Sequence, residues 1–141
     1  MHHDPAAAQP LAWRQRFDAL VAQRSRTPFA WGSHDCCLWA ADAVLAITGV
    51  DLAAAYRGTY ACAAGAARLL QRLGGLAALG QQVGPAIAPL QATVGDVGLV
   101  QRSDRQMLAV CCGAGWLVPG TAGLVLLQLD EALQAWRISH G

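Results

Sequence analysis

Residues 36–48 are the stretch that most restricts the fold of this chain, because they are apolar on nearly every face of a helix. Asp42 is the only charged residue among them. Asp35 is a favoured N-cap residue, and Gly49 can adopt the left-handed conformation in which helices commonly end. A helix that is apolar all round is buried, so the rest of the chain has to cover this one on every side.

The two halves of the chain have different sequence patterns. Up to about residue 82, apolar residues recur at helical spacing, which predicts further helices over 11–25 and 63–73. Beyond about residue 93, short β-like runs are separated by glycines. The expected strands cover residues 97–100, 108–112, 116–118 and 124–129. A loop is expected around Pro85 and Pro89, and a last helical turn over 130–136. Helices followed by antiparallel strands predict the α+β class.

Length and charge exclude several classes of protein. A chain of 141 residues forms one domain, which we expect to span residues 11–141 after a flexible N-terminal segment, residues 1–10. Ten basic and nine acidic side chains give a net charge of +1, which argues against nucleic-acid binding. No apolar run approaches the roughly 20 residues of a membrane span. The first residues lack the pattern of a secretory signal, so we expect synthesis in a cytoplasm.

Cys36 is the residue best placed for chemistry. A cysteine in the first turn of a helix lies near free backbone N–H groups and the positive end of the helix dipole, which favour the thiolate. The alternative is that Cys36 and its neighbour Cys37 are small core hydrophobes. Five cysteines are an odd number in a chain that needs no disulfides, so we expect thiols or ligands.

Residues 29–37 resemble the nucleophile motif of the NlpC-type cell-wall peptidases, which are papain-like enzymes. In these enzymes an Asp-Cys pair follows an aromatic-Trp-Gly turn at the start of a central helix, and Asp35-Cys36 matches that pair. Gly95-Asp96 matches the Gly-Asp that opens the first strand of their sheet. The resemblance implies a papain-like fold, in which N-terminal helices, including a buried helix that bears Cys36, pack on a C-terminal antiparallel sheet.

From about Trp13 to Ile138, the chain is also similar to a family of small phage tail proteins related to these peptidases. The matching segments are 34–36, 40–44, 48–51, 57–60, 65–66, 95–96, 110–111 and 135–137. Genes of this kind lie beside tail-tip and hub genes. The resemblance therefore implies a structural or assembly component of a phage tail tip, made in the bacterial host cytoplasm and located in the virion. Its partners would be other tail-tip or hub proteins, and no cofactor is implied.

The chain departs from the peptidases at the catalytic base. An NlpC-type peptidase carries a histidine on the second strand, facing the thiol whose proton it takes. Aligning that strand with residues 106–113 puts Met107 or Leu108 in its place, and no histidine lies between His34 and His140. We expect the His34 side chain to point away from the helix start, so the sequence favours a role without enzymatic activity.

An active cysteine peptidase or amidase that opens peptidoglycan during genome delivery is the alternative. Cys36 would be its nucleophile, and His34, Asp35 and Asp96 are the other candidate catalytic residues. Asp96 has a second interpretation, since a Gly-Asp at a strand start commonly fixes the turn.

Cys111 is a further candidate partner for Cys36, because one thiol of the 111–112 pair must face the helix. The two sulfurs could form a disulfide or contribute to a metal or iron–sulfur site in a tail component. A tetrahedral zinc site needs four ligands, so simple packing of the thiols is favoured over both, and no metal is expected. Asp42 is expected to be an internal anchor with Arg57 as its counter-charge.

Overall fold

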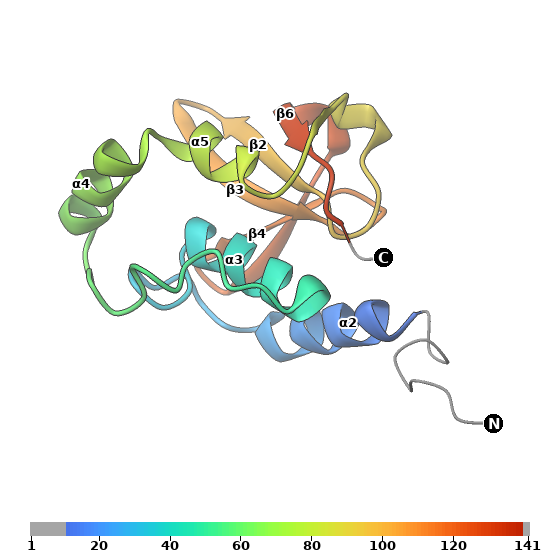
Figure 1. Cartoon of the computed structure of the whole chain (residues 1–141), viewed down its shortest axis with the longest axis horizontal. Helices are drawn as coiled ribbons and strands as arrows, with labels where there is room; N and C mark the ends of the chain where they lie inside the picture. Colours follow the sequence, from blue (N-terminus) through green and yellow to red (C-terminus); the bar gives the residue numbers. More distant parts are fainter. Residues whose placement is uncertain (1–10, 140–141) are drawn as a thin grey trace.

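The computed structural model describes residues 11–139, and the segment predicted to be flexible, residues 1–10, lies outside them. Within the described part the chain is α+β, as predicted: four helices over residues 12–81 are followed by one antiparallel sheet, and helices pack on this sheet (Figure 1). Among residues 11–139 there is no helix of the length and apolarity that crossing a membrane requires.

The helices lie where their sequence signals place them. They are α2 (Ala12–Arg24), α3 (Cys36–Thr48), α4 (Ala63–Leu73) and α5 (Leu76–Gln81). The predicted caps of α3 are confirmed: Asp35 accepts a hydrogen bond from the Leu38 amide at 3.0 Å, and Gly49 has a φ of 81°. Helix α5 was not predicted as a separate element. It begins directly after Gly74-Gly75, which ends α4.

The sheet follows the predicted strand positions in its middle and departs from them near its ends. Its strands are β1 (Ala86–Ile87), β2 (Val97–Arg102), β3 (Arg105–Cys111), β4 (Trp116–Gly120), β5 (Gly123–Leu127) and β6 (Ala132–Trp136), in the order β1-β6-β2-β3-β4-β5. The helical turn predicted over 130–136 is wrong for most of its length. Only its first two residues are helical, as part of a short 3-10 helix, Leu129–Glu131. Residues 132–136 form β6 because they pair with β2, which buries Ala135 and Trp136. The expected loop at 85–89 contains β1.

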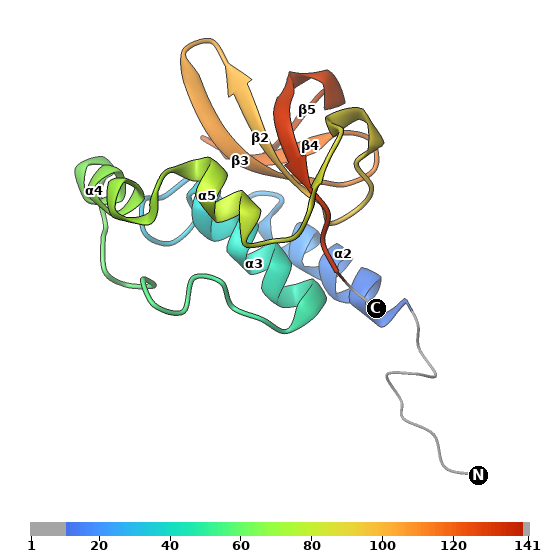
Figure 2. The ribbon, with the colours of Figure 1, turned by 45° about the horizontal axis from the view of Figure 1, so that its top comes forward.

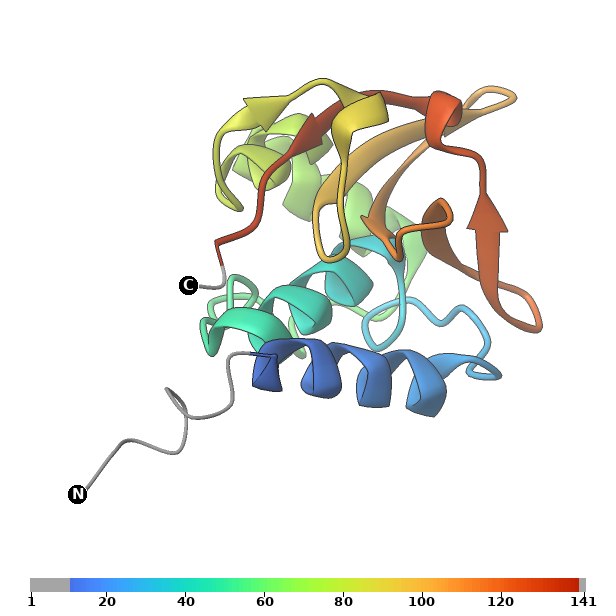
Figure 3. The same ribbon diagram turned by 90° about the vertical axis from the view of Figure 1, so that its right-hand side faces the viewer.

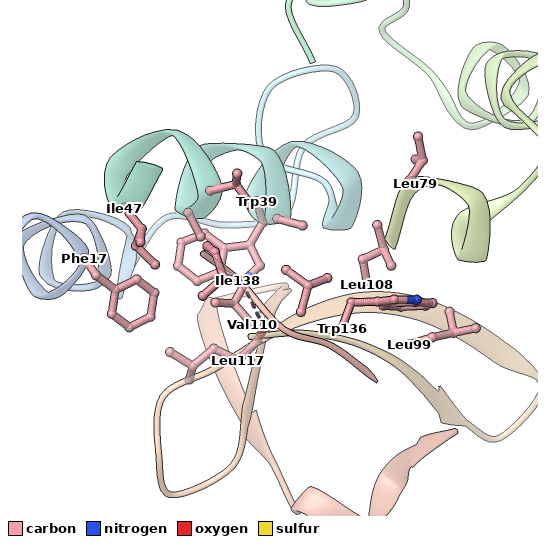
Figure 4. Packing of buried hydrophobic residues seen from close by; sticks show 14 residues of the cluster. Phe17, Trp39, Ile47, Leu79, Leu99, Leu108, Val110, Leu117, Trp136 and Ile138 are labelled. Carbon is pink, nitrogen blue, oxygen red and sulfur yellow. Dashed lines mark hydrogen bonds between the residues drawn. The ribbon is translucent and has the colours of Figure 1, made fainter. Parts of the chain in front are cut away.

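Helix α3 is largely buried, as predicted, but it is not covered on every side, because Leu45 is exposed. It lies beside α2 and beneath the sheet (Figure 3), and α5 packs against β2 and β3 (Figure 2). The Trp39 ring fills the space between α3 and the sheet, and its indole N–H donates to the Leu117 carbonyl at 2.9 Å (Figure 4). The opposite face of the sheet has a separate apolar cluster that includes Cys111 and Trp116.

Candidate functional site

The site is built on the N-terminus of α3, whose first residue is Cys36. The preceding turn depends on Gly32, which has a φ of 80°. A side chain at this position would collide with the carbonyl of Tyr60. The glycine therefore lets the chain reverse tightly beside Tyr60 and deliver the Asp35-Cys36 pair to the helix start.

Asp35 is almost fully buried and holds this turn together. One carboxylate oxygen accepts from the Leu38 amide at 3.0 Å, and the other accepts from the Gly32 amide at 3.0 Å and from the Tyr60 hydroxyl at 2.5 Å. Both oxygens are occupied by groups that fix the start of α3. The Asp35 carboxylate therefore positions Cys36. Burial raises the pKa of Tyr60, and the hydrogen bond with Asp35 raises it further.

The Cys36 thiol is half-buried and lies in surroundings that favour its ionised form. The neighbouring Cys37 thiol contributes most to lowering the pKa of Cys36, burial opposes it, and the Leu108 backbone amide and the Arg105 guanidinium lower it further. The pKa of Cys37 is correspondingly raised, by its hydrogen bond with Cys36 and by burial. The two thiols thus titrate as a pair in which Cys36 loses its proton first.

His34 points away from Cys36, as predicted. Its ring is 2 % exposed and stands edge-on to Trp39, with 6.0 Å between ring centroids. Its Nδ1 lies 3.1 Å from an Arg24 guanidinium nitrogen, which can only donate, so Nδ1 accepts and the proton is on Nε2. His34 is the only histidine within residues 11–139, and it does not line the cavity beside Cys36.

We expect the burial of His34 to make stability depend on pH. Burial and the Arg24 charge lower the pKa of His34, while Asp42 and Asp35 raise it by less. The unfolded chain, with a histidine pKa near 6.5, therefore takes up a proton at a higher pH than the folded chain. The contribution of His34 to the free energy of unfolding should be constant above about pH 7 and fall as the pH drops below about 6.5. Urea denaturation from pH 7.5 to 5 measures this. A His34→Gln variant that showed the same slope would contradict it.

Of the two residues aligned with the strand histidine, Leu108 is the one that faces α3. Its side chain joins the core cluster that contacts α3, and its backbone amide is the group that acts on the Cys36 sulfur. Met107, the other residue aligned with the histidine, packs against the cluster on the opposite face of the sheet. Among the described residues, the thiol therefore faces a main-chain amide and a guanidinium, and no imidazole.

Asp96 is fully buried and does not line this cavity. One of its carboxylate oxygens accepts from the Thr93 amide at 2.8 Å, and the other accepts from the Ile138 amide at 2.9 Å. Arg137 forms an ion pair with it at 3.2 Å. These contacts fix the turn before β2 and the two residues after β6, in agreement with the structural interpretation of the Gly-Asp.

The structure does not bring Cys111 to Cys36. Cys111 is buried in the cluster on the far face of the sheet, where its sulfur accepts a hydrogen bond from the Gly113 amide at 3.4 Å. All five cysteines are free thiols. No three His, Cys, Asp or Glu side chains within residues 11–139 are grouped to hold a metal ion. Neither the disulfide nor the shared metal site considered for this pair is formed, because strand alternation turns Cys111 away.

Asp42 is an internal anchor, as predicted. It bridges Arg57, the expected counter-charge, at 2.7 Å and Arg24 at 3.0 Å. Because Arg24 also contacts His34, this ion-pair group ties α2 and the segment after α3 to the side of α3 that faces away from the cavity.

A cavity of about 90 Å³ opens beside Cys36. Three of its lining residues were missed by sequence reasoning: Tyr56 and Tyr60, which precede α4, and Arg105, at the start of β3. The Arg105 guanidinium lies over the rings of Phe29 and Trp31, 5.4 Å and 5.9 Å from their centroids. Aromatic residues before Gly32 and an arginine in the hairpin were visible in the sequence, but only the fold brings them together.

Comparison with known proteins identifies a family for nearly the whole described fold. No curated protein matches the chain. A family model described as a domain of unknown function (DUF6950) matches residues 10–138, which include every helix and strand described above and the whole Cys36 site. The chain therefore belongs to the DUF6950 family.

Proposed function

We propose that this domain is a structural or assembly component of a phage tail tip, with an NlpC-related, papain-like fold that has lost its Cys–His pair. The observation that carries the proposal is the environment of Cys36. Its sulfur is influenced by Cys37, the Leu108 amide and Arg105, whereas the His34 ring contacts Arg24 on another side of α3. A general base must lie within hydrogen-bond reach of the proton it removes, and His34 does not meet this requirement.

The papain-like part of the proposal is supported by the order and packing of the elements. A cysteine begins the central helix, an aromatic-Trp-Gly turn precedes it, and the helix packs on β3 of an antiparallel sheet. Gly95-Asp96 directly precedes β2, the first long strand. Motif and architecture therefore agree with one another, although fold alone is no warrant for activity.

The tail-tip part of the proposal is supported by the family resemblance of the sequence and by the character of the surface. Only 13 % of the residues are charged. Large apolar side chains are exposed on the sheet half of the domain, with Leu90 69 %, Leu126 54 % and Leu133 55 % exposed. Low charge and exposed apolar side chains suit a domain that is buried between subunits.

The experiment is to follow the protein through phage particle purification. Under this proposal it stays with gradient-purified particles at a fixed copy number, and a deletion of its gene prevents complete tails. Cys36→Ala should restore assembly and infection as well as the unmodified gene does. Absence of the protein from purified particles would contradict a tail-tip role.

An active cysteine peptidase or amidase is the second candidate, favoured by the lowered pKa of Cys36 and by the cavity beside it. Incubation of the purified protein with peptidoglycan distinguishes the two. If muropeptides are released by the wild-type chain and not by Cys36→Ala, the domain is a hydrolase with an unconventional base. The structural proposal predicts no release by either protein.

A further inference from the structure

The cavity beside Cys36 has an apolar interior and a polar mouth. Its interior is formed by α4 and α5 through Ala66, Leu69, Leu70, Leu76 and Leu79. At its mouth are Trp31, Arg105 and Gln106, all of them exposed. Its volume of about 90 Å³ is several times the roughly 10–15 Å³ that a single water requires, so a small aliphatic side chain can enter it.

The Tyr56 hydroxyl is an unused polar group in this cavity. The side chain lines the cavity and is only 7 % exposed, yet its hydroxyl forms no hydrogen bond with a described residue. A tyrosine hydroxyl is protonated at neutral pH and can donate, and burial moves the pKa of Tyr56 further from neutrality, to about 12. The hydroxyl oxygen is not one of the fully buried atoms, and it has no partner among residues 11–139, so it is free to donate to a polar atom of a ligand in the cavity.

Arg105 supplies a positive charge that no described acidic residue neutralises. Arg102, which faces Arg105 across the hairpin turn, pairs with Glu131 at 3.3 Å, but Arg105 has no ion pair within residues 11–139. Its guanidinium is held over the rings of Phe29 and Trp31, which positions it at the mouth of the cavity. Its N–H donors are therefore available to an anion.

Asp35, whose buried carboxylate lines the cavity, is not the anion that pairs with Arg105. The Asp35 oxygens already accept from the Leu38 and Gly32 amides and from the Tyr60 hydroxyl. The apolar interior, the Tyr56 hydroxyl and Arg105 are thus the three groups left for a ligand.

We propose that this cavity binds an acylated apolar amino acid with a free carboxylate, whose side chain enters between α4 and α5, whose carboxylate meets Arg105 and whose amide accepts from Tyr56. Such a group occurs as a free small molecule and as the last residue of a polypeptide. Binding requires no chemistry at Cys36 and no place in a phage tail, so this proposal and the proposed function can fail separately.

The test is a calorimetric or NMR titration of the full chain with N-acetyl-leucine, with N-acetyl-leucinamide as its neutral match. We expect the acid to bind at least tenfold more tightly than the amide, because a hydrogen bond between ionised groups is stronger than one in which the acceptor is neutral. Arg105→Met should abolish this difference, and Arg105→Lys should restore part of it. Arg102→Met is the matched control on the same hairpin and should change the affinity by less than about twofold.

Two further measurements make the result decisive. Tyr56→Phe should weaken binding of the acid by about threefold to tenfold. Bound acid should also slow the alkylation of Cys36, because it covers the sulfur. A pentapeptide ending in leucine, tested as its C-terminal acid and as its C-terminal amide, separates the two sources. If the peptide acid binds and the peptide amide does not, the site is assigned to a chain terminus. The proposal is overturned if acid and amide bind equally, if Arg105→Met behaves as Arg102→Met does, or if no acid binds at about 10 mM.

Discussion

Replacing Asp35 by alanine should lower the free energy of unfolding by about 3 kcal/mol. The side chain is 2 % exposed and accepts three hydrogen bonds, from the Gly32 and Leu38 amides and from the Tyr60 hydroxyl. Alanine removes the N-cap of α3 and leaves these donors without their acceptor in a buried position. The loss therefore exceeds the ~1 kcal/mol that an exposed N-cap contributes.

Chemical denaturation at pH 7.5 measures this effect, and Ser33→Ala is the control. Ser33 lies two residues away in the same turn, is exposed and makes no side-chain hydrogen bond with a described residue, so its loss should cost less than ~0.5 kcal/mol. If Asp35→Ala were as stable as Ser33→Ala, the carboxylate would not organise the start of α3.

The second large effect is expected at Trp39. Its side chain is fully buried between α3 and the sheet, and its indole N–H donates to the Leu117 carbonyl (Figure 4). Trp39→Ala removes both the packing and the hydrogen bond, and should cost about 4 kcal/mol. Trp39→Phe keeps most of the packing and should cost roughly half as much.

Leu45→Ala is the control for Trp39, since Leu45 is on the same helix but 40 % exposed. Its removal should lower the free energy of unfolding by about 1 kcal/mol or less. The slope of that free energy against denaturant concentration should not change. A cost for Leu45→Ala equal to that for Trp39→Ala would mean that α3 is not held to the sheet by the Trp39 side.

Most of the architecture was predictable because its signals are local. Asp35 and Gly49 are adjacent to the apolar stretch that they cap, so both ends of α3 could be predicted from the sequence. Residues 132–136 contain alanine, leucine and glutamine, which favour helices, but they form β6 by pairing with the distant strand β2, as in the pair of Val97 with Trp136. Such distant pairing overrides local preference and has no local signal.

The candidate site was only half predictable for the same reason. Asp35 and Cys36 belong to one short motif, and the structure places them at the helix start as expected. Tyr56 and Arg105 reach the cavity from segments distant in the chain, and their types alone indicated no function. The orientation of Cys111 depended on the strand register, which the run of residues 108–112 did not determine.

The central claim is that the Cys36 thiol is governed by Cys37, the Leu108 amide and Arg105, and not by an imidazole. The most direct measurement is the rate at which iodoacetamide alkylates Cys36 as a function of pH, followed by mass spectrometry of the peptide that contains it. We predict that the pKa obtained lies below the ordinary thiol value of 9.0, is unchanged in His34→Gln and is higher in Arg105→Met. Loss of Cys36 reactivity at neutral pH in His34→Gln would contradict this account.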